Sequence, residues 1–198
     1  MNAIDIWQMG YTSRPQIIVL TGDIGVGKTT LCRALIDAVH MEGWRVHGLC
    51  SPGVFVDGVK VAIDVLDLGS GDRRQLAIRR TIPDENSPTS NWQFDPVVLN
   101  WADAVLGAIE TTDLLVIDEL GQLELRHASG WRNALPLLAR QEYAVACVVV
   151  RHWLVDDFLS HFHAAKVIHV RHPNNHEYVP PEGFEPPTSG SEDRCSNH

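Results

Sequence analysis

The residues with the clearest chemical potential lie in the segment TGDIGVGKTT, residues 21–30. Its glycines, its lysine and the threonine that follows fit the pattern G-x-x-x-x-G-K-[ST] in full. Gly25 and Gly27 allow backbone N–H groups to turn inward around a β-phosphate, because no Cβ stands in the way. We expect Lys28 to reach the β- and γ-phosphates of a nucleotide, and the Thr29 hydroxyl to ligate Mg²⁺. The segment therefore predicts nucleotide binding.

A second candidate group lies in LLVIDELGQLEL, residues 114–125. Apolar residues run directly into Asp118 and Glu119, which predicts two carboxylates at the carboxyl end of a buried parallel strand. Ligands bind at that edge in open α/β sheets. We expect Asp118 to hold the Mg²⁺ shell through water and Glu119 to polarise the attacking water. The N–H of Gly121 would sense the γ-phosphate, whereas a glutamate such as Glu124 is more often a surface charge.

Short apolar segments alternate with segments of helical spacing along the chain, which is typical of an α/β fold. The helix over 95–109 is expected to begin at Asp95-Pro96, an N-cap followed by proline in the first turn. Strands are expected at 16–20, 45–50, 114–117, 144–150 and 166–170, and the other helices at 28–42, 130–140 and 153–162.

A different pattern separates the second strand from the loop at 81–92. Asp57-Gly58 stands between two short apolar runs, 54–56 and 59–61, which is a strong signal for a β-hairpin. Further strands are expected at 61–68 and 75–78, on either side of the turn 69–72. The sequence thus predicts an antiparallel insertion within the α/β chain.

Length and composition indicate one soluble domain. The chain has 198 residues, of which 44% are hydrophobic and 21% charged. Its formal net charge of -9 argues against general nucleic-acid binding. The apolar periodicity stops near residue 172, and the proline-rich remainder cannot offset its chain entropy by burial. We expect a domain over 1–175 and a disordered tail over 176–198.

The sequence contains no apolar run near the length that spans a bilayer, about 20 residues. Its first residues also lack the basic start and apolar core of a secretory signal. Four cysteines lie far apart without metal-ligand spacing, as expected for reduced thiols. We therefore expect a cytoplasmic protein without a membrane partner.

Three segments together resemble a known family: TGDIGVGKTTL, GLCSPGVFVDGVKVAIDVLDLGSG and LLVIDELGQLEL. They are similar to the small nucleoside-triphosphatases first known from thermophiles, which have cancer-related homologues in animals. The resemblance covers about residues 16–170. It implies a RecA-like P-loop NTPase fold, with a mostly parallel central sheet, helices on both faces and an antiparallel hairpin insertion. It also implies Mg²⁺-dependent hydrolysis of ATP, GTP and other nucleoside triphosphates.

The resemblance also implies which residues form the site. The motifs themselves assign the roles: Lys28 and Glu119 are expected to be catalytic, and Thr29 and Asp118 to serve the metal. One departure is that many members carry an acidic residue and an arginine where this chain has Gly53 and Phe55. The residues expected to line the nucleotide are Gly22, Asp23, Ile24, Gly25, Val26, Gly27, Lys28, Thr29, Thr30, Val116, Ile117, Asp118, Glu119, Leu120, Gly121, Gln122 and Leu123.

An arginine could complete the site. Arg151 follows the strand at 144–150 and could stabilise charge on the γ-phosphate, although a surface position is at least as common. Arg73, Arg74 and Arg126 are rival candidates. Ser51, at the end of its strand, could face the nucleotide or cap a turn.

Two alternatives to hydrolysis stay open at this level. A small-molecule kinase would need a second pocket for its acceptor and an arginine-rich lid, and the loop at 81–92 contains no arginine. A slow nucleotide-binding adaptor, in cofactor or metal handling, would need the phosphate loop but no fast turnover. The sequence identifies no protein partner.

Overall fold

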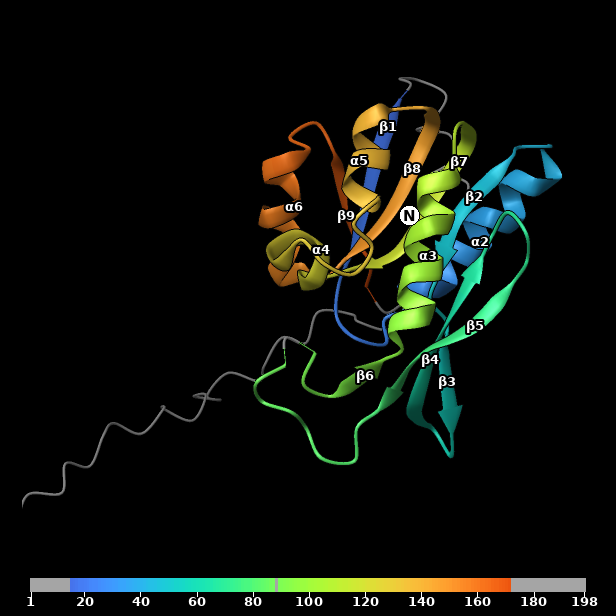
Figure 1. The fold of residues 1–198 in the computed structure, drawn as a ribbon. Coiled ribbons are helices and arrows are strands. Elements are labelled where there is room, and N and C mark those ends of the chain that lie inside the picture. Colours follow the sequence, from blue (N-terminus) through green and yellow to red (C-terminus); the bar gives the residue numbers. More distant parts are fainter. Residues whose placement is uncertain (1–14, 88, 172–198) are drawn as a thin grey trace, which may run out of the picture.

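The computed structural model describes residues 15–87 and 89–171. The tail expected at 176–198, and its boundary at 175, lie outside these residues. Figure 1 shows one twisted sheet with helices on both faces. In chain order the elements are β1 (Gln16–Thr21), α2 (Lys28–Met41), β2 (Val46–Cys50), β3 (Gly53–Val56), β4 (Val59–Asp67), β5 (Arg73–Arg79), β6 (Trp92–Phe94), α3 (Pro96–Ala108), β7 (Thr112–Leu120), α4 (Gln122–His127), α5 (Ala134–Arg140), β8 (Tyr143–Val150), the 3-10 turn η1 (His152–Leu154), α6 (Val155–His161) and β9 (Lys166–His169).

The sheet has two parts with different strand directions. Its strands follow the order β6-β5-β4-β2-β7-β8-β1-β9, and β3 pairs with β4. Strands β2, β7, β8, β1 and β9 pair in parallel and form what we call the parallel part. Strand β4 joins β2 in the antiparallel sense and begins the antiparallel extension, β3 to β6. The predicted α/β class, with its antiparallel insertion, is confirmed.

The parallel part is buried on both faces. Every residue of β1 and β8 is buried. Successive side chains of a strand point to opposite faces. Accordingly Ile18 and Leu20 belong to one core cluster, with helix α2, while Ile17 and Val19 belong to the other. This two-sided burial explains why these strands read as continuous apolar runs in the sequence.

Helices α2 and α3 cover opposite faces of the sheet. Helix α2 buries Cys32, Leu35, Ile36 and Val39, which recur at helical spacing. Helix α3 begins as predicted at Asp95, whose carboxylate accepts the N–H of Val97 at 2.8 Å. It contacts β2, β4 and β5, and therefore spans the junction between the parallel part and the antiparallel extension.

Several boundaries differ from the sequence prediction. Strand β7 continues to Leu120, and two short elements, β6 and α4, were not expected. The helix expected at 130–140 begins only at Ala134, because Gly130 adopts a positive φ of 69° and turns the chain first. None of the helices in the described part of the chain is long and apolar enough to cross a membrane.

Candidate active site

Four neighbouring strands of the parallel part deliver the candidate residues to one edge of the sheet. The phosphate loop follows β1, and Ser51 follows β2. Asp118 and Glu119 lie near the end of β7, and Arg151 follows β8. Because these strands are parallel and adjacent, their carboxyl ends meet at the edge where ligands bind in open α/β sheets.

The phosphate loop needs glycine at its first position for two reasons. Gly22 has a φ of +142°, which L-residues rarely adopt, and a Cβ there would lie 2.5 Å from the Val170 carbonyl oxygen. Gly27, with a φ of +94°, precedes the first turn of α2. No side chain caps this helix, so its first N–H groups remain available to an anion.

Lys28 lies folded over the loop that it follows. Its Nζ donates to the carbonyl oxygens of Gly22, at 2.8 Å, and Asp23, at 2.7 Å. Burial lowers the pKa of the Lys28 ammonium, while the carboxylate of Glu119 acts in the opposite direction. A bound triphosphate would add negative charge at the same place and favour the charged form of the lysine.

Asp118 is buried and held from three sides. Its Oδ1 accepts from the Thr29 hydroxyl at 3.3 Å, and its Oδ2 accepts from the Ser51 N–H at 3.1 Å. The Cys50 thiol also donates to Oδ2, at 3.3 Å. Burial raises the pKa of the Asp118 carboxyl, and the Ser51 N–H opposes this shift. Thr29 and Asp118, far apart in the sequence, thus meet at the start of α2.

Glu119 is turned out of its strand by unusual backbone geometry. Its φ is +84°, and the pairing of β7 with β8 shifts register between Ile117 and Leu120. A non-glycine residue in this conformation costs about 1–3 kcal/mol, which is common at functional sites. The turn points Glu119 away from the core, and its carboxylate forms an ion pair with Arg151.

Arg151 is the arginine that the fold brings to the carboxylates. Its guanidinium also lies 5.4 Å from the centre of the Trp153 ring. The rival arginines are bound elsewhere: Arg73 pairs with Asp64, Arg126 pairs with Asp157, and Arg74 lies over Trp101. Sequence reasoning could name Arg151 as a candidate but could not choose it.

Glu124 is not the surface charge that the sequence suggested. Its carboxylate accepts hydrogen bonds from two backbone N–H groups, that of Gly121 at 2.9 Å and that of Trp131, also at 2.9 Å. Burial raises the pKa of the Glu124 carboxyl, and these two N–H groups oppose the shift. The Gly121 N–H, which was expected near the γ-phosphate, is therefore bound to Glu124 in this state. Glu124 fixes the turn that follows the carboxylates.

Some residues expected to line the nucleotide lie in the core. Val116, Ile117 and Leu120 are fully buried within β7, because the strand packs on both faces. Their side chains lie in the two cores, so within the expected range 116–123 these three residues offer a ligand only their backbone atoms. In the phosphate loop Asp23, Ile24 and Thr30 are exposed, and Val26 is partly buried. Gln122 and Leu123 instead line a pocket beside Glu119.

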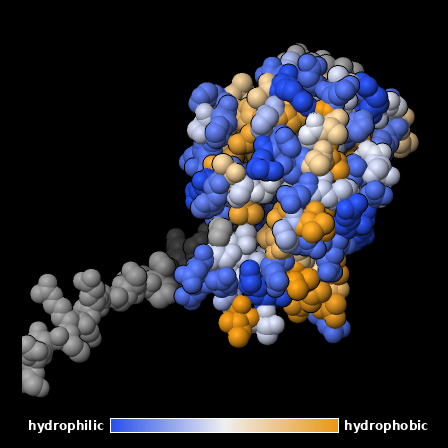
Figure 2. All heavy atoms as spheres, in the orientation of Figure 1, coloured by the Kyte–Doolittle hydropathy of each residue, from blue (hydrophilic) through white to orange (hydrophobic). Residues whose placement is uncertain are grey.

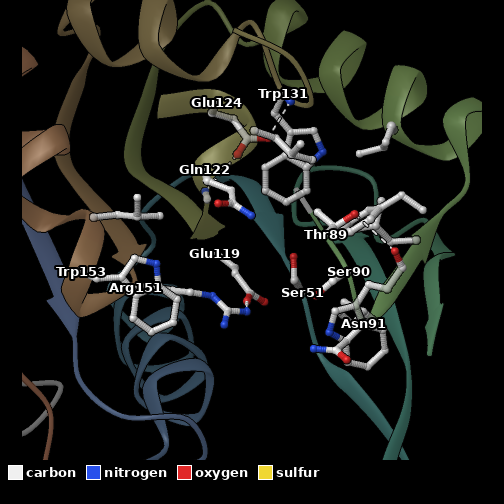
Figure 3. A pocket seen from close by; sticks show the side chains of 18 residues that line it. Ser51, Thr89, Ser90, Asn91, Glu119, Gln122, Glu124, Trp131, Arg151 and Trp153 are labelled. Atoms are coloured by element: carbon white, nitrogen blue, oxygen red, sulfur yellow. Dashed lines mark hydrogen bonds and ion pairs between the residues drawn. The ribbon is translucent and has the colours of Figure 1, made fainter. Parts of the chain in front are cut away.

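This pocket, of about 250 Å³, was not visible in the sequence. Figure 3 shows Arg151 and Glu119 to the left, Ser51 to the right of Glu119, and Trp131 above them. Its other walls include residues of β5, β6, α3 and the segment before β6. The residues meet only through the fold, because they come from distant parts of the chain.

Comparison with known proteins decides the family. The model of the family described as NTPase matches residues 17–182. The chain belongs to this NTPase family, a family of hydrolases. It is 31% identical over 115 residues to nucleoside-triphosphatase THEP1 of Methanopyrus kandleri. The matched region covers 57% of this chain and 61% of that protein. It is 25% identical over 160 residues to nucleoside-triphosphatase THEP1 of Caldivirga maquilingensis, covering 80% of this chain and 88% of that one.

A solved structure shares the fold. The solution structure of a human cancer-related nucleoside triphosphatase aligns with a TM-score of 0.61 and 21% identity, covering 80% of this chain and 90% of that one. This likeness agrees with the RecA-like P-loop architecture that the sequence predicted. The family resemblance read from the three sequence segments is likewise confirmed.

Proposed function

We propose that this protein hydrolyses nucleoside triphosphates, ATP and GTP among them, to diphosphate and phosphate in a Mg²⁺-dependent reaction. The observation that carries the proposal is the 3.3 Å contact between Thr29 Oγ1 and Asp118 Oδ1, directly beside Lys28. It brings a metal-binding hydroxyl and a buried carboxylate to the mouth of the phosphate loop. Thr29 and Asp118 would hold Mg²⁺ there, and the ion would supply positive charge that offsets the negative charge developing on the phosphates.

Lys28 and the start of α2 would hold the phosphates. The ammonium now donates to two loop carbonyls, at 2.8 and 2.7 Å, and can exchange these acceptors for β- and γ-phosphate oxygens. The uncapped N-terminus of α2 adds its N–H groups and the positive end of its dipole. None of these contacts reads the base, which supports tolerance for several nucleotides.

Glu119 would orient the attacking water. The outward-turned carboxylate can accept a hydrogen bond from a water molecule, while Arg151 fixes the carboxylate on its other side. The same guanidinium would help offset charge on the γ-phosphate in the transition state. Asp118 is less suited to this work, because it is buried and its carboxylate is directed to Thr29, Ser51 and Cys50, where it would serve the metal.

The proposed compartment is the cytoplasm, where nucleoside triphosphates are abundant. Cys32, Cys50 and Cys147 are free and buried, which is consistent with a reducing environment.

The test is phosphate release from ATP and GTP, measured with Mg²⁺ and again with excess EDTA. We expect turnover only with the metal. Thr29→Val keeps the side-chain shape but removes the hydroxyl, so it should raise the Mg²⁺ concentration needed for half-maximal turnover at least ten-fold. Thr81→Val, at an exposed position, is the matched control and should behave as wild type. Full turnover in EDTA would contradict metal dependence, and no release from any nucleotide would contradict hydrolysis.

A further inference from the structure

The pocket beside Glu119 is lined mainly by large apolar side chains. Trp92 and Phe94 come from β6, Leu99 from α3 and Leu76 from β5, and Trp131 closes the opposite side. At about 250 Å³ the pocket is slightly smaller than ordinary small-molecule sites, which span about 300–1,000 Å³. Its size and aromatic walls suit a small planar molecule.

Two residues that line this pocket each carry a buried polar side-chain atom without a partner. Within the described residues, the Ser51 hydroxyl and the Trp131 indole N–H are two of three buried side-chain polar atoms without a hydrogen bond. Ser51 is 4% exposed and Trp131 is 3% exposed. Leaving such a group unpaired costs about 1–3 kcal/mol, so both atoms are expected to bind something.

The chemistry of these atoms defines the missing partner. An indole N–H only donates, so the partner must offer an acceptor to Trp131. A hydroxyl both donates and accepts, and Figure 3 shows the Ser51 hydroxyl pointing into the space between Glu119 and Trp131. Glu119 only accepts when it is ionised. A ligand hydroxyl near Ser51 and Glu119, together with a ring acceptor near Trp131, would satisfy all three groups.

We propose that this pocket binds a small planar molecule bearing a hydroxyl group, and that this hydroxyl accepts the γ-phosphoryl group. The inference rests on the proposed function, because Glu119 serves both reactions. The acceptor oxygen forms a bond to the γ-phosphorus, and the bond from that phosphorus to the β–γ bridging oxygen breaks. The hydroxyl proton passes to Glu119, and the nucleoside diphosphate leaves. Hydrolysis is then the reaction with water when the pocket lacks its acceptor.

The pocket supplies the acceptor site that a kinase requires. The loop at 81–92 contains no arginine, but Arg151 follows β8, pairs with Glu119 and lines the pocket. An occupied pocket would also exclude water from Glu119, since the carboxylate forms part of its lining. A hydroxyl compound should therefore divert turnover from free phosphate to a phosphate ester.

The test uses 3-(hydroxymethyl)pyridine and 3-(hydroxymethyl)quinoline as probes, because each has a ring acceptor and a hydroxyl. The matched 3-methyl compounds lack only the hydroxyl. In ¹⁵N–¹H spectra, we expect the Trp131 indole signal, assigned with Trp131→Phe, to shift saturably, while the signal of Trp101 outside the pocket stays fixed. With ATP and Mg²⁺, ³¹P spectra should show a phosphate monoester from at least one hydroxyl probe and none from the methyl compounds.

The control for probe binding is a variant in which a larger side chain fills the pocket. Leu99→Trp should weaken probe binding and ester formation at least ten-fold, while phosphate release from ATP alone stays within two-fold of wild type. Val97→Trp, on the same helix but 70% exposed, should change neither. Leu99→Phe replaces the first variant if it does not fold.

Three results would overturn this inference. If neither hydroxyl probe binds more tightly than its methyl partner, the assigned ligand chemistry is wrong. If a probe binds but no ester forms, the pocket does not hold an acceptor. If Leu99→Trp raises the KM for ATP, the pocket holds the nucleobase. In each case phosphate release from ATP alone still supports hydrolysis, whereas its absence would refute the proposed function itself.

Discussion

The parallel part of the sheet and the antiparallel extension bury their side chains differently. In β1 and β8 every residue is buried, because helices cover both faces. In β3, by contrast, Phe55 is 63% exposed and Val56 is 54% exposed. Figure 2 shows hydrophobic side chains at the lower end of the molecule, where Figure 1 places the β3–β4 hairpin.

This difference separates two tasks. The parallel part holds the phosphate loop and the carboxylates on strands that are fixed from both sides. The extension supplies β5 and β6, which form part of the wall of the pocket beside Glu119. Helix α3 contacts both parts and holds them in register. Changes in the parallel part should therefore disrupt phosphate chemistry or folding, and matched changes in the extension should not.

The largest expected effect is at Lys28. Lys28→Ala removes the one side-chain cation of the phosphate loop, and should lower kcat/KM for ATP about 10³-fold, the upper range for losing a group that stabilises transition-state charge. The fold should persist, because the ammonium contacts only loop carbonyls. Lys60→Ala, in the extension, is the control and should stay within two-fold of wild type. Wild-type turnover in Lys28→Ala would refute the phosphate-loop assignment.

The next effect is at Glu119. Glu119→Gln keeps the shape but removes the charge, so kcat should fall about 10²-fold, as for loss of a general base. Nucleotide affinity should hold or tighten, since repulsion with the γ-phosphate is relieved. Rapid-quench turnover and equilibrium binding of ATP separate the two effects.

Glu124→Gln is the informative comparison for this variant. Its single amide oxygen can accept only one of the two N–H groups, of Gly121 and Trp131, that the carboxylate now accepts. We expect about 1 kcal/mol lower stability and a smaller loss of kcat. If Glu124→Gln lost turnover while Glu119→Gln kept it, Glu124 would be the base.

The fold was largely predictable where one pattern dominates. Two-sided burial makes β1 and β8 continuous apolar runs, and Asp95 before proline marks the start of α3. The two missed elements are short: β6 has 3 residues and α4 has 6, too few to show a period. Their positions depend on pairing with β5 and on the Glu124 contacts, which are tertiary.

The site was predictable where a local motif carries it. The segment 21–30 predicts the phosphate loop, and the segment 114–125 predicts a carboxylate at the end of a parallel strand. Parallel strands end at one edge of the sheet, and there Thr29 contacts Asp118. The choice of Arg151, the role of Glu124 and the pocket could not be read from the sequence, because each depends on contacts between distant elements. The positive φ of Glu119 gave no local signal either, since glycine is the residue usually found there.

A third comparison tests backbone strain in the two parts. Gly22→Ala adds a Cβ that meets the Val170 carbonyl oxygen at 2.5 Å, at a φ of +142°. We expect it to destabilise the fold by about 3 kcal/mol, from overpacking and strain together. Gly58→Ala in the hairpin also has a positive φ, +77°, but nothing lies within 4 Å of the added Cβ. It should cost only about 1 kcal/mol. If urea denaturation gave equal losses of unfolding free energy for the two variants, the contact with Val170 would be unimportant.

The smallest expected effect concerns a single hydroxyl group. Val56→Thr replaces one exposed methyl in the hairpin by a hydroxyl that water can reach, so the free energy of unfolding should change by no more than about 0.5 kcal/mol. Val148→Thr makes the same replacement in β8, where the side chain is fully buried and the new hydroxyl must leave water. There we expect a loss of about 1–3 kcal/mol. Both residues lie in strands and the two side chains have nearly the same shape, so strand propensity and packing volume change little. Urea denaturation of both variants under the same conditions measures the difference. A loss at Val56 as large as that at Val148 would show that the hairpin face is covered in solution, and the contrast between the two parts of the sheet would then be false.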